Sequence, residues 1–213
     1  MQSDWAAENL RVIRTLMERS TVYRCALAPM TLLAGSLGTG AALVGWWLGI
    51  ASPRAFVLYW LAVAAVTLVG VSLLVRRQAL QAGEPFWSPP ARRVARAALP
   101  AFVAALCVTI GALVALESMH RTAGTPELVL RLLPVGWVLF YGLALNAAGF
   151  FMPRGIQFFG WIVLVLGGLA LVALSASAAF PLTGHGLMGT CFGLLHLAYG
   201  LYLAFTEGRG SRP

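Results

Sequence analysis

Long apolar runs separated by short polar links dominate the pattern of the chain. Six runs carry almost no charged residue, and each is close to the length of about 20 residues that an α-helix needs to cross a bilayer. The pattern therefore predicts an all-α fold: an integral membrane six-helix bundle over residues 28–206, followed by a short tail over 207–213. The expected spans lie near residues 28–50, 56–75, 98–116, 130–151, 156–179 and 186–205.

The segment before the first run has a different periodicity. Leu10, Ile13 and Met17 recur at spacings of three and four, and charged side chains occupy the opposite side. Residues 1–27 therefore predict an amphipathic helix that lies flat on the cytoplasmic face of the membrane. Two interpretations of it stay open: a docking helix that leads into the first span, or an element that binds a partner.

Composition and charge support a membrane protein. The chain is 60% hydrophobic and 10% charged, and its net charge of +8 comes from arginines at the ends of the apolar runs, so orientation in the membrane explains the charge without nucleic acid. Three arginines fall on one side: Arg54, Arg121 and Arg131. The other twelve fall on the side of both termini, which the positive-inside rule places in the cytoplasm.

Small residues mark the helix faces that pack together. In the first span they follow a spacing of three and four over Gly35, Gly38, Ala42, Gly45 and Gly49, and similar stripes occur in the third and last spans. Small residues let helix backbones approach closely in a membrane. The other two stripes are Ala98, Ala101, Ala105 and Ala112, and Gly186, Gly189, Gly193, His196 and Gly200.

His196 is the main candidate for a functional group, because the stripe around it directs an ionisable side chain into the bundle. Helical rise places several polar side chains at comparable depths, so we expect His196 to meet Thr39 or Tyr141, and Asn146 to meet Tyr199. The full candidate cluster, structural or ligand-binding, is His196, Tyr199, Asn146, Tyr141, Thr39 and Ser36.

Two interpretations of this histidine remain open. In one, a neutral imidazole forms an ordinary hydrogen bond between helices. In the other, it belongs to a site for a quinone, a lipid headgroup or a neutral solute, flanked by Tyr199, Tyr202, Trp137 and Tyr141. A haem or metal site is not expected, since His185 lies about 16 Å away along the same helix and His120 lies in a link. We expect no cofactor.

An enzyme or an ion-coupled transporter is also disfavoured. No GxSxG, HExxH or comparable catalytic set occurs, and every carboxylate lies outside the expected spans, whereas proton or cation coupling commonly uses a buried acid. The sequence thus favours a membrane subunit, scaffold or sensor in a larger assembly. The alternative is a carrier or binding protein near His196.

The link before the third span combines aromatic and basic residues. It is interpreted as a belt that contacts anionic lipid at the inner leaflet, or alternatively as a docking site for a cytoplasmic partner protein. We call this set the aromatic–arginine belt. It comprises Phe86, Trp87, Arg92, Arg93 and Arg96.

Three stretches, LRVIRTLMERSTVY, NAAGFFMPRGIQFFGW and GTCFGLLHLAYGLYL, together resemble small multi-pass bacterial membrane proteins of unknown function. The resemblance covers most of the chain. It implies a location in the bacterial inner membrane and no activity. Independently of this resemblance, we expect membrane lipids as partners, with another membrane or cytoplasmic protein as a further candidate.

Overall fold

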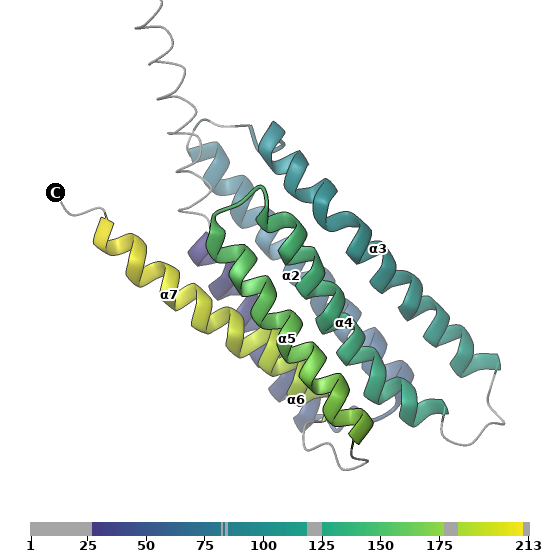
Figure 1. Cartoon of the computed structure of the whole chain (residues 1–213). Helices are drawn as coiled ribbons and strands as arrows, with labels where there is room; N and C mark the ends of the chain where they lie inside the picture. Colours follow the sequence, from purple (N-terminus) through teal and green to yellow (C-terminus); the bar gives the residue numbers. More distant parts are fainter. Residues whose placement is uncertain (1–26, 82, 84, 119–124, 177–182, 211–213) are drawn as a thin grey trace, which may run out of the picture.

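A computed structural model describes residues 27–81, 83, 85–118, 125–176 and 183–210 (Figure 1). Six helices in these ranges are long and apolar enough to cross a membrane, which confirms the predicted all-α six-helix architecture. The amphipathic helix expected over residues 1–27 lies outside the described residues, apart from Leu27. The first span, Leu27–Trp47, is called the first helix. The next four are α2 (Pro53–Gln81), α3 (Pro89–Ser118), α4 (Thr125–Gly149) and α5 (Arg154–Ala176). The last span consists of three segments: α6 (Gly184–Met188), the π-helix η1 (Gly189–Leu194) and α7 (Leu195–Gly210).

Two helices are longer than the apolar runs predicted. α2 continues to Gln81, and α3 begins at Pro89, a residue suited to the first helical turn because its nitrogen needs no hydrogen-bond acceptor. The link expected over residues 76–97 is therefore reduced to residues 82–88. The reason is physical: main-chain hydrogen bonds continue a helix into the headgroup region, where the side chains are no longer apolar.

The first helix and the last span pack face to face along their small residues. A Cβ atom on Gly35 would lie 2.6 Å from the amide nitrogen of Leu197, and one on Gly193 would lie 2.7 Å from the amide nitrogen of Thr39. Gly45 meets the ring of His185 further along. The order of these contacts makes the two helices antiparallel, and the predicted stripes in both helices face each other. Gly49, with φ of +64°, lies in the turn after the helix and has no neighbour within 4 Å, so it is not part of this seam.

A second close pair is formed by α4 and α5. A Cβ atom on Gly160 would lie 2.8 Å from the amide nitrogen of Asn146, and one on Gly142 would lie 2.9 Å from the amide nitrogen of Leu164. Gly149 meets the backbone of its partner helix in the same way. The two helices form a tight antiparallel hairpin, and its inner side carries the core of the bundle. This core contains Val135, Val138, Phe159, Val163, Ala170, Leu187 and Cys191.

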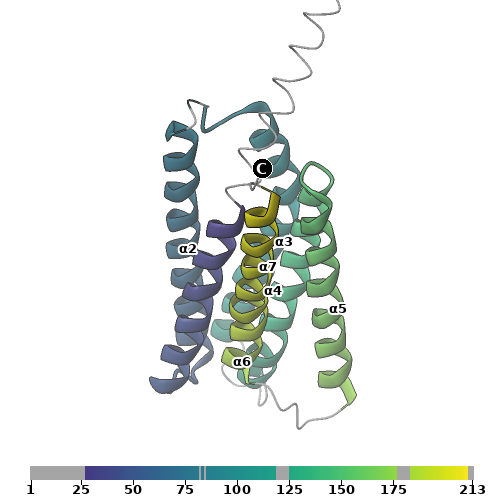
Figure 2. The same ribbon diagram turned by 90° about the vertical axis from the view of Figure 1, so that its left-hand side faces the viewer.

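α3 lies at the edge of the bundle in Figure 1, and α2 lies at the edge in Figure 2. In the most apolar window of each, only 11% of residues are buried, compared with 28–39% in the other four spans. The first helix lies between α2 and α7 (Figure 2), and the hydroxyl of Tyr59 on α2 donates a 2.5 Å hydrogen bond to the carbonyl of Ala41. α3 packs on α4. Most of the apolar surface of α2 and α3 therefore faces outward.

The described arginines divide between the two ends of the bundle. Arg54 and Arg131 lie at one end, and each forms an ion pair, with Glu117 and Glu127 respectively. The other end holds the start of the first helix, the end of α7 and the α4–α5 turn (Figure 2). Its arginines form no ion pair with any residue in the described ranges: Arg76, Arg77, Arg92, Arg93, Arg96 and Arg154. Among the described residues, the arginines without an ion pair thus gather at one end of the bundle.

Candidate functional site

His196 lies at the centre of the bundle and is enclosed by side chains from three elements. It is 3% exposed. The ring of Phe159 on α5 meets the imidazole edge-on, with 5.0 Å between the ring centroids. The ring centroids of Tyr141 on α4 and Phe192 on η1 lie 5.4 Å and 6.4 Å from that of the imidazole. The expectation that His196 points into protein is correct. It lies on the flank of the glycine seam, toward α4 and α5.

The π-helix η1 explains how the imidazole is held. The amide of Leu195, which in an α-helix would donate to the carbonyl of Cys191, donates to that of Thr190. Nδ1 of His196 lies 3.0 Å from the oxygen of Cys191. A carbonyl only accepts, so Nδ1 carries the proton in this bond.

The opposite nitrogen of the ring is also bonded. Nε2 of His196 lies 2.7 Å from the hydroxyl of Tyr141. An uncompensated charge at membrane depth is costly, so the imidazole is neutral, and its Nε2 accepts the proton of the Tyr141 hydroxyl. Both ring nitrogens are therefore used in bonds within the protein, and neither offers a free lone pair to a metal ion or a reacting proton.

The structure brings together only part of the expected cluster. Tyr141 bonds to His196 as one alternative predicted, and Tyr199 stacks on Phe159 at 4.7 Å. Thr39 does not reach His196: its hydroxyl lies against Gly193 and has no hydrogen-bond partner in the described ranges. Ser36 is exposed on the outer side of the first helix, because it is one residue, or about 100°, away from the seam.

Asn146 does not form the expected bond to Tyr199. Its side-chain nitrogen is buried with no partner among the described residues, and its backbone packs on Gly160. The hydroxyl of Tyr199 lies beside Gly155, at the start of α5, where a Cβ atom would come within 2.6 Å. Two of the aromatic residues expected to flank a ligand are also elsewhere: Tyr202 is exposed, and Trp137 belongs to a different cluster.

That different cluster surrounds His185 and was missed by the sequence reasoning. Phe56, Tyr59 and Trp60 of α2 surround the imidazole, with ring centroids 4.9, 5.9 and 6.0 Å away. Trp137 of α4 stacks on Phe56 at 6.3 Å. The spacing of the three α2 aromatics, at i, i+3 and i+4, was the available signal, since it places them on one helix face.

His185 is also held as a neutral ring, but the roles of its two nitrogens are reversed: Nδ1 accepts a hydrogen bond and Nε2 donates one. The indole N–H of Trp60 donates to Nδ1 at 3.2 Å, and an indole N–H only donates. Nε2 donates to the carbonyl of Ile50 at 2.9 Å, which ties the last span to the turn after the first helix. The two histidines of the last span are thus both connectors between helices.

The aromatic–arginine belt is divided between the link and α3. Phe86 and Trp87 lie in the link, 39% and 58% exposed, with ring centroids 6.4 Å apart. Its three arginines occupy the first turns of α3 and are exposed. The belt therefore forms an accessible surface at the arginine-rich end of the bundle.

Other routes to a function are not supported by the described residues. No group of three His, Cys, Asp or Glu side chains comes together there as a metal site would require. Comparison with protein-family models, curated proteins and solved structures finds no match for this chain. The proposed function therefore rests on the arrangement of helices and side chains and on no known relative.

Proposed function

We propose that this chain is a non-catalytic membrane subunit or scaffold, which holds a partner membrane protein against α2 and α3. The observation that carries the proposal is the outward orientation of these two helices: 11% of the residues in the apolar window of each are buried, although both are fully formed spans. A helix at the edge of one chain has a face that is available for packing against a helix of a second protein.

The interior of the bundle supports the same proposal. Both buried histidines have their two nitrogens bonded within the protein, and aromatic rings occupy the space beside them. A carrier for a quinone-like, lipid-like or neutral solute near His196 would need a space beside the imidazole. Two surface hollows lie elsewhere, near Leu68 on α2 and near Val108 on α3.

The proposed setting is the bacterial inner membrane with both termini in the cytoplasm. It is supported by the larger number of described arginines at the end where the first helix starts and α7 ends. Alkaline phosphatase is active only outside the cytoplasm. We expect it to be inactive when fused after Arg209 and active when fused after Ser118; the reverse pattern contradicts the orientation.

Site-specific photo-crosslinking in intact membranes tests the subunit proposal. A photoreactive residue at Leu106, which is 52% exposed on α3, should give one discrete protein adduct, because this face would lie against the partner. The matched control is Val172 on α5, which is 65% exposed and should react with lipid only. Adducts of the same kind at both positions, or with lipid alone at both, contradict the proposal.

A further inference from the structure

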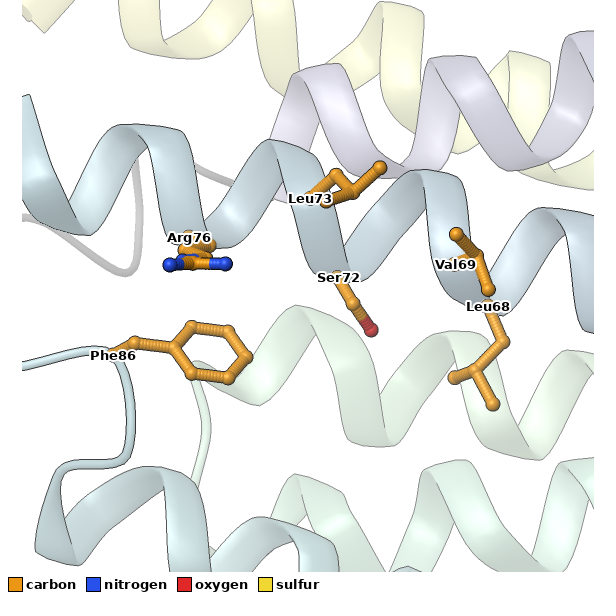
Figure 3. A pocket seen from close by; sticks show the side chains of 6 residues that line it. All are labelled: Leu68, Val69, Ser72, Leu73, Arg76 and Phe86. Atoms are coloured by element: carbon orange, nitrogen blue, oxygen red, sulfur yellow. The ribbon is translucent and has the colours of Figure 1, made fainter.

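An open hollow on the surface lies along α2, near the link to α3. Its volume is about 380 Å³, within the range of about 300–1,000 Å³ typical of sites for small molecules. α2 contributes Leu68, Val69, Ser72, Leu73 and Arg76, and the link contributes Phe86. We call this hollow the α2 groove (Figure 3).

The chemistry of the α2 groove changes along its length. At one end the guanidinium of Arg76 and the ring of Phe86 face each other, and the hydroxyl of Ser72 points into the same space (Figure 3). Leu68 marks the other end, eight residues earlier and about 12 Å along the helix axis. The groove is thus cationic and polar at the level of the helix ends and purely apolar deeper in the membrane.

The polar groups of the α2 groove have no bonding partner among the residues that the structure describes. Arg76 forms no ion pair in the described ranges, in contrast to Arg54 and Arg131 at the opposite end. Ser72 forms no hydrogen bond to any described residue, although Thr109 and Ser175 each bond to the carbonyl four residues earlier. A cation and a hydroxyl are therefore both available to an anionic acceptor.

We propose that the α2 groove binds one anionic phospholipid. Its phosphate accepts hydrogen bonds from Arg76 and Ser72, and the upper part of one acyl chain lies against Phe86, Leu73, Val69 and Leu68. Charge complementarity decides the occupant: an arginine near the membrane surface attracts anionic headgroups, and a charge-assisted bond to an arginine is stronger than one between neutral groups. The exposed arginines of the aromatic–arginine belt lie at the same end of the bundle and favour the same ligand.

Native mass spectrometry of the full chain in mild detergent tests this site, with phosphatidylglycerol and phosphatidylcholine of identical acyl chains as probes. We expect one phosphatidylglycerol to be retained with a preference of about fivefold or more, the effect of one arginine beside an anionic headgroup. Arg76→Gln should abolish the preference. Arg77→Gln is the matched control: it is the next residue on the same helix, is also exposed and lies outside the groove, and should change the preference by less than about twofold.

A third variant tests the apolar end. Leu68→Trp places a large ring in the lower part of the α2 groove and should reduce retention of both phospholipids. Equal losses in the Arg76→Gln and Arg77→Gln proteins would show general attraction to the belt and overturn the proposal. Equal binding of the two phospholipids, or full retention in the Leu68→Trp protein, would also overturn it.

Discussion

Gly38→Val should destabilise the bundle more than any other single change considered, by about 3 kcal/mol or more. A Cβ atom at Gly38 would lie 2.7 Å from the carbonyl carbon of Phe192 and 3.0 Å from the amide nitrogen of Gly193. Both are backbone atoms, so no rotamer change relieves the clash, and the first helix and last span must separate. In a chain of this length, the melting temperature in detergent should fall by roughly 6–12 °C.

Gly40→Val is the matched control for this prediction. Gly40 is two residues away on the same helix, is exposed, and has nothing within 4 Å of its Cβ position. Its substitution should change stability by less than about 0.5 kcal/mol. If the two variants melt at the same temperature, the close packing of the first helix against the last span at Gly38 is contradicted.

His196→Leu should have the second largest effect, a destabilisation of about 2 kcal/mol. Leucine fills a comparable volume but bonds to neither neighbour, so the hydroxyl of Tyr141 and the carbonyl of Cys191 each lose a hydrogen bond inside the bundle. Tyr141→Phe removes only one of these bonds and should cost about 1 kcal/mol, within the range measured for bonds between membrane helices.

The double variant separates the bond from general packing. Because Tyr141 and His196 share one hydrogen bond, the protein with both substitutions should be more stable than the sum of the single effects predicts, by about 1 kcal/mol. Tyr202→Phe is the control, since Tyr202 is exposed on the same span and makes no bond to His196. Strictly additive single effects would contradict the Tyr141–His196 bond.

The spans and packing faces follow from local features of the sequence, which is why they could be predicted. Apolar length fixes where a helix crosses hydrocarbon, and spacing of small residues fixes which side packs. The stripe through Gly35 and Gly38 predicted the correct face of the first helix. It did not indicate the partner, because stripes of the same spacing occur in several spans, and only the structure pairs it with Gly193.

The environment of His196 was predictable only in part. Depth along the helix correctly suggested Tyr141 as a neighbour of His196. It also suggested Ser36, although the angular position of Ser36, one residue after Gly35, would have excluded it. The bond to Cys191 could not be predicted, since it depends on a π-helical turn that redirects one backbone amide. No side-chain pattern encodes that turn.

We propose that the protein acts through its outer faces and that its interior, around His196, is closed. Native mass spectrometry of the chain purified from its own membrane, compared with the His196→Leu protein, tests this most directly. We predict that both proteins carry the same small molecules, including any phospholipid in the α2 groove. A stoichiometric quinone-like or lipid-like molecule that is present in the unsubstituted protein and lost from the His196→Leu protein would contradict the account.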